Sequence, residues 1–293
     1  MPEVARRATV GAELAAAGQV LAAAGVPEPD RAAAGIWAGL EGRSPGSVWL
    51  QRAEHAGEET IRRFRKAVER RARGEPLAYV LGRAAFRTIE LAVDSRVLIP
   101  RPETEGLVDQ VLAWGEHRGE PWGVAVDVGT GSGAVALSLA VEGAFTRVIA
   151  TDLSAAALAV ASANRSSMEA RVRTPVDLRL GSVLEPVSEM ADVIVSNPPY
   201  LTEAEFAALD ADVRDYEPSL ALVGGADGLA PTRALLVQAR DRLRPGGLLA
   251  VEVDSSRAET VQALARKTGW ASGRIAPDVF GRSRYFLAGG GSE

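Results

Sequence analysis

The run VAVDVGTGSGAVALSLA, residues 124–140, is the most informative stretch of this 293-residue chain. Its first five residues form a short, mostly apolar segment that predicts a buried strand, and its last seven, rich in alanine, can form a helix. Between them stand glycines at positions 129, 131 and 133. Glycine lets the backbone turn tightly and approach a ligand, and the start of the next helix offers its amide groups to that ligand. The run therefore predicts a strand, a ligand-binding loop and a helix.

Strands and helices alternate along the rest of the chain. Short apolar segments that predict further strands occupy residues 148–151, 176–180, 193–195, 248–253 and 285–287. Helical patterns start at Ser154 and cover about residues 233–243 and 257–267. This alternation is typical of an α/β fold in which a parallel sheet carries helices on both faces. We expect the last of these segments to be an edge strand.

Two shorter regions precede this alternation. Residues 1–75 contain three segments with helical spacing of apolar side chains, and they predict a small helical domain. Residues 76–102 contain strand-like segments at 77–81, 86–93 and 97–99, and they predict a linker with a β-hairpin. The third helical segment carries seven basic residues between Arg62 and Arg73. They could bind an acidic partner or RNA, but acidic residues four positions earlier favour a solvated helix face.

The composition excludes several classes of protein. The chain has no cysteine, which excludes disulfide scaffolds, thiolate catalysis and cysteine-ligated metals. Its two histidines, His55 and His117, lie far apart in the sequence, and no metal is expected. A net charge of −5 argues against a direct nucleic-acid substrate. Because no apolar stretch reaches the ~20 residues of a membrane span, we expect no membrane association and a cytoplasmic location.

Two carboxylates indicate which ligand the glycine loop binds. Asp127 precedes the loop by two residues, where it would attract a cationic group and repel a pyrophosphate. Asp152, at the end of the next strand, is placed to accept both hydroxyls of a ribose. Gly129, Gly131 and Ala134 also fit the dinucleotide-binding pattern, which alone is a weak signal. The two acids instead favour a ligand with an amino acid part, a ribose and no phosphate, such as S-adenosylmethionine.

A second motif, Ser196-Asn197-Pro198-Pro199-Tyr200, follows a predicted strand. Ligands collect outside the carboxyl ends of strands in an open parallel sheet. The two prolines fix the backbone and withhold amide donors, so the carbonyl groups around them project as acceptors in a rigid frame. Asn197 Oδ1 and the Pro198 carbonyl could accept both hydrogens of a planar –NH2 group, leaving its nitrogen aimed at an electrophilic methyl group. Tyr200 can stack on the flat substrate group.

Each motif also has an alternative interpretation. The glycine loop could serve only a tight turn from strand to helix, and the second motif could be a proline-rich turn after a buried strand. Finding both motifs in one chain favours methyl transfer from a sulfonium to an amide or aromatic amine nitrogen. Carbonyl dipoles around that nitrogen would stabilise the positive charge that arrives on it.

With both motifs, the chain resembles the PrmC/HemK family of class I methyltransferases, which modify a glutamine in peptide chain release factors. The resemblance covers nearly everything from Gly74 onward. Besides the two motifs, it rests on residues 74–82, 98–105, 212–214, 217–218 and 224–229. The string Ile-Pro-Arg-Pro-Glu-Thr-Glu at residues 99–105 is the most specific of these.

The resemblance implies an architecture and a reaction. Residues 1–75 would dock the release factor, residues 76–102 would be the hairpin linker, and residues 103–293 would form a Rossmann-like catalytic domain with a mostly parallel seven-stranded sheet. The enzyme would move a methyl group from S-adenosylmethionine to the side-chain nitrogen (N5) of the glutamine in a Gly-Gly-Gln motif, releasing S-adenosylhomocysteine. It would need no metal and act as a monomer.

The resemblance and the motifs together assign residues to roles. Those expected to bind the cofactor are Asp127, Gly129, Thr130, Gly131, Ser132, Gly133, Asp152, Ser182, Val183 and Asn197. Those expected to bind substrate and support catalysis are Asn197, Pro198, Pro199 and Tyr200. Arg101, Pro102 and Glu103 would lie at the cofactor's edge, or would simply start a helix with a proline and an acid.

Two features depart from the family pattern. Ser182 and Val183 stand where the family often has an aspartate near the adenine, so contact there would rely on the backbone or the hydroxyl. Asp254 stands two residues after Glu252, where the family usually has glycine.

Two rival functions remain. A nucleic-acid adenine N6-methyltransferase would use the same frame for an exocyclic amine after base flipping, but it needs a basic recognition region. A non-catalytic scaffold could keep the fold and bind ribosomal partners, although the intact residues 197–200 count against it.

Overall fold

The computed structural model of the chain describes residues 8–119 and 121–290. They form two compact units. One holds the described residues up to Arg83 together with Asp210–Tyr216, and the other holds Ala84–Leu209 and the described residues from Glu217 onward. The first unit thus ends at residue 83, within the range 76–102 that is expected to be the linker. Residues 210–216 join the N-terminal unit from within the range expected to be catalytic.

The N-terminal unit is helical. Its helices are α1 (Val10–Ala23), α2 (Pro29–Glu41), α3 (Pro45–Leu50), α4 (Glu58–Ala72), α5 (Leu77–Leu81) and α10 (Ala211–Arg214). In its core the rings of Trp37 and Phe64 meet edge to face, with centroids 4.8 Å apart. The Tyr216 hydroxyl donates a hydrogen bond to the Arg73 carbonyl (2.9 Å), which ties the α10 segment to the end of α4.

The basic helix α4 uses several of its arginines inside the helical unit. Arg65 pairs with the buried Glu13 of α1 at 2.6 Å. Arg70 pairs with Glu75 and also donates to backbone carbonyls of α5. These contacts stabilise the packing of α4 against its neighbours, and much of its positive charge is thereby engaged within the unit.

The linker region differs from the prediction in three places. Residues 77–81 form the helix α5, not a strand, because Pro76 precedes its first turn and Gly82, with φ 70°, ends it in the left-handed conformation. The predicted single strand 86–93 contains the turn of a hairpin between β1 (Arg83–Phe86) and β2 (Ile89–Ala92). Residues 97–99 form no strand.

The second unit contains a seven-stranded sheet, as the family resemblance predicted. Its order is β5-β4-β3-β6-β7-β9-β8. The strands are β3 (Val124–Val128), β4 (Arg147–Asp152), β5 (Val176–Leu180), β6 (Ala191–Ser196), β7 (Leu243–Glu252), β8 (Arg274–Pro277) and β9 (Ser283–Gly289). Strands β3 to β7 pair in parallel, whereas β9 is antiparallel to both of its neighbours.

The edge of this sheet was predicted wrongly. Residues 285–287 belong to β9, which lies inside the sheet between β7 and β8. The strand at this edge of the sheet is β8, which has four residues and ends at Pro277. So short a segment, closed by proline, carries too little alternation to be recognised in the sequence.

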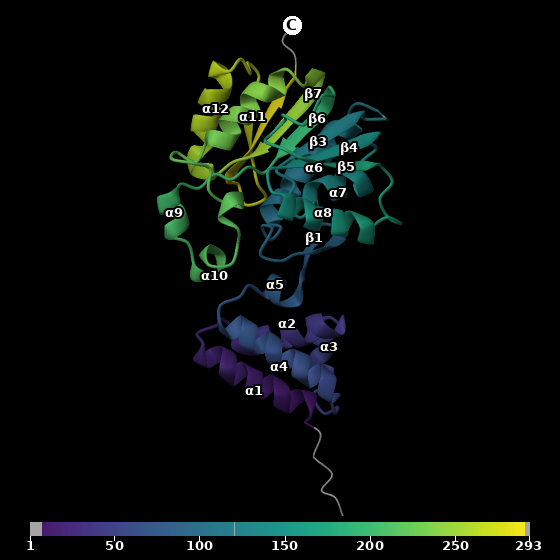
Figure 1. Cartoon of the computed structure of the whole chain (residues 1–293), viewed down its shortest axis with the longest axis vertical. Helices are drawn as coiled ribbons and strands as arrows, with labels where there is room; N and C mark the ends of the chain where they lie inside the picture. Colours follow the sequence, from purple (N-terminus) through teal and green to yellow (C-terminus); the bar gives the residue numbers. More distant parts are fainter. Residues whose placement is uncertain (1–7, 120, 291–293) are drawn as a thin grey trace, which may run out of the picture. The chain divides into compact units, whose positions relative to one another are not determined.

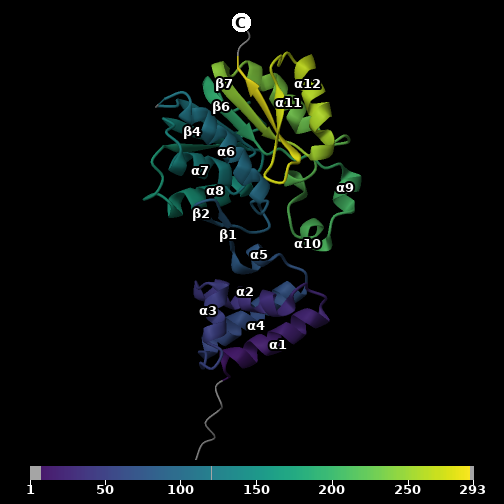
Figure 2. The ribbon, with the colours of Figure 1, turned by 180° about the vertical axis from the view of Figure 1, so that it is seen from behind.

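Helices cover both faces of the sheet. They are α6 (Pro102–Glu116), α7 (Ala134–Glu142), α8 (Ala155–Ser167), α11 (Ala230–Arg240) and α12 (Ala258–Lys267), with shorter turns α9 (Glu203–Ala207), η1 (Ser219–Ala221) and η2 (Ser255–Arg257). Helices α11 and α12 pack on one face over a core that includes Val126, Ile194 and Leu249. Helices α6, α7 and α8 lie together apart from α11 and α12 (Figure 1), and Figure 2 shows the same grouping from behind.

The sheet order sets where a ligand can bind. From β3 the chain goes to β4 on one side, and later returns to β6 on the other side of β3. A crevice forms outside the carboxyl ends of parallel strands at such a switch point. Asp127, Asp152 and Ser196 stand at or next to the carboxyl ends of β3, β4 and β6.

None of the helices in the part of the chain that the structure describes combines the length and the apolar character that a membrane span requires.

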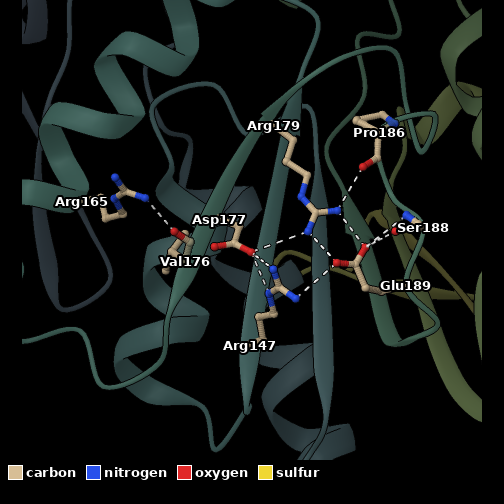
Figure 3. A network of polar contacts seen from close by, with 8 residues as sticks. All are labelled: Arg147, Arg165, Val176, Asp177, Arg179, Pro186, Ser188 and Glu189. Carbon is tan, nitrogen blue, oxygen red and sulfur yellow. Dashed lines mark hydrogen bonds and ion pairs between the residues drawn. The ribbon is translucent and has the colours of Figure 1, made fainter.

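An ion network stabilises the β5 side of the sheet. Arg147 of β4 contacts Asp177 of β5, and both Arg147 and Arg179 reach Glu189 in the loop before β6 (Figure 3). Arg179 donates two hydrogen bonds to the Glu189 carboxylate, at 2.6 and 2.8 Å. These bonds lower the pKa of Glu189 from 4.5 to about 2.

We expect Glu189→Gln to lower the free energy of unfolding by about 1 kcal/mol at pH 7, since a partly exposed ion pair of this kind contributes little more. The folded pKa lies below the unfolded one, so the stabilisation is complete above pH 4.5 and is lost as the pH falls toward 2. Urea denaturation at pH 7 and pH 3.5 measures the difference. If the difference in unfolding free energy between the two proteins does not shrink at pH 3.5, the Glu189 carboxylate is not its source.

Candidate active site

A cavity of about 410 Å³ lies at the carboxyl ends of β3, β4 and β6. Most residues that the sequence assigned to ligands line it: Gly129, Gly131, Asp152, Ser182, Val183, Asn197, Pro198 and Pro199. Other assigned residues are not part of its lining: Asp127, Thr130, Ser132, Gly133 and Tyr200. No motif in the sequence predicted the apolar wall, which includes Leu98, Leu153, Ala157, Leu220 and Pro231.

The glycine loop needs glycine for its backbone shape. Gly129, Gly131 and Gly133 have φ values of 76°, 55° and 87°, in the left-handed region that side chains disfavour. The amides of Gly129 and Thr130 both donate to the Thr151 carbonyl at 2.9 and 3.0 Å. These bonds hold the loop against the end of β4 and expose its first glycines to the cavity.

Asp127 holds the glycine loop by hydrogen bonds. Its side chain is buried, and Oδ2 accepts hydrogen bonds from Thr130 Oγ1 (2.7 Å) and from the Ala136 amide (3.0 Å) in the first turn of α7. The carboxylate therefore binds the loop itself rather than lining the cavity. Its expected attraction for a cationic ligand group would act through the loop.

Burial raises the pKa of Asp127 to about 7, so below that pH the carboxyl is mostly protonated in the folded protein. The stabilisation that comes from protonating Asp127 is complete below pH 3.8 and is lost as the pH rises through 7. Asp127→Asn imitates the neutral form and keeps an oxygen acceptor for Thr130. Between pH 5 and pH 8 we expect the variant to gain about 1 to 3 kcal/mol in unfolding free energy relative to the wild type. Urea titrations at both pH values test this, and a difference independent of pH would contradict it.

Asp152 ends β4 at the cavity wall. Its Oδ2 accepts from the Gly131 amide and its Oδ1 from the Ser154 amide, each at 2.8 Å. A carboxylate oxygen has more than one lone pair, so both oxygens can also accept from a ligand hydroxyl. Burial raises the pKa of Asp152 above its ordinary value. The two backbone bonds hold the carboxylate in one orientation beside the glycine loop.

The segment after β5 forms another part of the wall. Val183 has φ 51°, a conformation that a β-branched side chain rarely adopts, and its carbonyl accepts a hydrogen bond from Thr151 Oγ1 (2.8 Å). Such strain is tolerated where surrounding contacts enforce it, and it is common at ligand sites. Ser182 and Val183 thus both line the cavity.

Asn197 follows β6 directly and lines the cavity. The preceding Ser196 donates through Oγ to the Val128 carbonyl (2.8 Å), which ties the ends of β6 and β3 together. Asn197 Nδ2 donates to Thr104 Oγ1 at 3.0 Å. The amide of Asn197 is therefore held by a residue that the sequence assigned no role.

The Pro-Pro-Tyr segment is packed against a glycine-containing loop. A Cβ atom at Gly224 would lie 2.4 Å from the Pro199 carbonyl oxygen, and one at Gly228 would lie 2.2 Å from that of Tyr200. Only glycine allows this approach, which explains the glycines of residues 224–229. Burial raises the pKa of Tyr200 to about 12, so its phenol stays protonated.

The string at residues 99–105 makes other contacts than those expected at the cofactor's edge. Arg101 pairs with the buried Glu217, which also accepts a hydrogen bond from the Ile99 amide (3.2 Å). Pro102 and Glu103 begin helix α6, as the alternative interpretation proposed. Arg101, Pro102 and Glu103 are not part of the cavity lining, so their expected position at the cofactor's edge finds no support.

Two family models match this chain. The model described as the PrmC N-terminal domain matches residues 14–82, and the model described as the methyltransferase small domain matches residues 116–212. A solved methyltransferase from Pyrococcus furiosus is 22% identical, with a TM-score of 0.52 over 69% of this chain and 89% of its own. That likeness concerns the fold alone.

Relatives of known name extend over most of the chain. The release factor glutamine methyltransferase of Cereibacter sphaeroides is 39% identical over 268 residues, covering 92% of this chain and 94% of the relative. The protein of the same name from Moorella thermoacetica is 45% identical over 230 residues, or 77% and 79% of the two chains. A third, from Deinococcus radiodurans, is 38% identical over 92% of this chain and 94% of its own.

Proposed function

The chain belongs to the family of release factor glutamine methyltransferases, and from this premise we propose that it methylates a glutamine side chain of a peptide chain release factor. The methyl donor is S-adenosylmethionine, and the product is N5-methylglutamine in the Gly-Gly-Gln motif. The observation that carries the proposal is a single cavity lined by both the glycine loop with Asp152 and the Asn197-Pro198-Pro199 segment.

The residues of the cavity fit S-adenosylmethionine. Asp152 offers two oriented carboxylate oxygens for ribose hydroxyls, and Gly129 and Gly131 leave room for close approach of a ligand to the backbone. Leu153 and Ala157 provide an apolar surface that suits an adenine ring. When bound, this cofactor supplies an electrophilic methyl group on a sulfonium sulfur.

The substrate carboxamide would be held by the frame that follows β6. Asn197 Oδ1 and the Pro198 carbonyl each accept one N–H of the glutamine side chain, which points its nitrogen toward the methyl group. The cofactor would supply the methyl group with its S–C bond broken toward sulfur, and the nitrogen that gains the new N–C bond would release one proton to water. The acceptors stabilise the positive charge while it arrives on nitrogen, so no strong base is needed beforehand.

Incubating the purified protein with a release factor and S-adenosylmethionine tests this function. Mass mapping of the release factor should find one added methyl group, on the glutamine of Gly-Gly-Gln. Transfer of labelled methyl to DNA or RNA in preference to the release factor would instead support the adenine methyltransferase alternative. Tight cofactor binding without turnover on any of these substrates would support the non-catalytic scaffold.

Three further expectations stay predictions: that residues 1–75 dock the release factor, that residues 76–102 act as a linker, and that the protein is a monomer. The same holds for the assignment of individual residues to cofactor and substrate, which the variants proposed below address.

A further inference from the structure

A chain of two hydrogen bonds connects Asn197 to the sheet through helix α6. Asn197 Nδ2 donates to Thr104 Oγ1 at 3.0 Å, and Thr104 Oγ1 donates to Glu252 Oε2 at 2.8 Å. Thr104 lies in the first turn of α6, and Glu252 is the last residue of β7, next to the strand that Asn197 follows. Thr104 and Glu252 are 6% and 2% exposed, so water does not compete for these bonds.

The chain of bonds has a direction. An ionised carboxylate can only accept hydrogen bonds, so Thr104 gives its single hydroxyl hydrogen to Glu252. The Thr104 oxygen then has only lone pairs left for Asn197, and it can pair with the Nδ2 amino group but not with Oδ1. The two ends of an asparagine amide have almost the same shape, so this bond decides which end points where.

The orientation matters for the reaction. Within the described residues, Oδ1 of Asn197 has no hydrogen-bond donor, and it is free to accept one from a ligand in the cavity that Asn197 lines. With the amide reversed, its own –NH2 group would face the –NH2 group of the substrate. Two donors would then meet, and the glutamine nitrogen would no longer be held in line with the methyl group.

We infer that Thr104, held by Glu252, is a positioning residue that turns the carbonyl oxygen of Asn197 toward the substrate carboxamide. The inference rests on the function proposed above and goes beyond it, because neither Thr104 nor Glu252 is part of the cavity lining. The charged groups around Glu252 are Arg101, Glu103 and Arg284. Burial raises the pKa of Glu252 to about 7, so the test is best made at pH 8.5, where the carboxylate is ionised.

The test compares variants of the full-length protein in the release-factor assay. Thr104→Val keeps the shape of the side chain and removes the hydroxyl, and we expect kcat to fall by about 10- to 100-fold. The dissociation constant of S-adenosylmethionine, measured by calorimetry, should stay within about threefold. Thr104→Ser restores the hydroxyl and should recover kcat to within about threefold of the wild type.

A second buried threonine provides the matched control. Thr174 donates through Oγ1 to the Phe145 carbonyl (2.8 Å), and neither residue lines the cavity. Thr174→Val removes the same kind of buried bond and should leave kcat unchanged. Glu252→Gln keeps the Thr104 hydroxyl but places an amide that can donate a hydrogen bond beside it. We expect kcat to fall in this variant too. A purely structural role for Thr104 would not predict that fall. This variant also keeps the inference testable if Thr104→Val does not fold.

The outcomes separate the inference from the proposed function. If the wild-type protein fails to methylate the release factor, the function is wrong. If the wild type turns over and Thr104→Val does so at the same rate, the inference is wrong. Equal losses in Thr104→Val and Thr104→Ser would likewise overturn it, because the hydroxyl would then not be the group responsible.

Discussion

Asn197→Ala should lower kcat for release-factor methylation by about 100- to 1000-fold, while the protein remains folded. The substitution removes the carbonyl acceptor that holds one N–H of the substrate glutamine and stabilises the charge arriving on its nitrogen. Loss of one preorganised polar group that acts in the transition state commonly costs 100- to 1000-fold. Asn197 is half-buried at a cavity wall and not part of the apolar core, so little stability depends on it.

Two controls accompany this experiment. The unfolding midpoint in urea should match that of the wild type, and calorimetry should still detect binding of S-adenosylmethionine. Mass mapping of the release factor then reports the methyl transfer itself. A variant that methylates the glutamine at the wild-type rate would exclude Asn197 from catalysis, whatever the result for Thr104.

Asp152→Ala should weaken the binding of S-adenosylmethionine by about 10- to 100-fold. Hydrogen bonds to a charged group are worth about 1.5 to 3 kcal/mol, and this carboxylate is proposed to accept both ribose hydroxyls. The substitution also leaves the amides of Gly131 and Ser154 without their acceptor, so the glycine loop loses part of its support. Calorimetric titration with the cofactor measures the effect directly.

Asp177→Ala is the matched control for Asp152→Ala. It removes the same charge from the neighbouring strand β5, within the ion network shown in Figure 3 and away from the cavity lining. Its affinity for S-adenosylmethionine should equal that of the wild type. If both variants bind the cofactor equally well, Asp152 has no role in holding it.

Two features of the structure could not be predicted from the sequence. Residues 77–81 are five apolar or small residues, and so short a run does not distinguish a strand from one turn of helix. Asp127 stands two residues before the glycine loop, but spacing alone does not tell whether its carboxylate faces a ligand or the loop backbone. In both cases the missing information is the surrounding packing, which decides the backbone conformation of residues 77–81 and the direction of the Asp127 side chain.

The α/β fold, the family and the two motifs at the carboxyl ends of their strands could all be predicted from the amino-acid sequence. Those features follow from local properties: the period of apolar residues, the backbone freedom of glycine at positions 129, 131 and 133, and the rigidity of Pro198 and Pro199. Which atoms are in contact became known only from the folded structure. Thr104 and Glu252 are 148 residues apart, and their hydrogen bond forms because α6 packs against the sheet beside β7. A contact of this range depends on the packing of whole elements, and no local pattern in the chain encodes it.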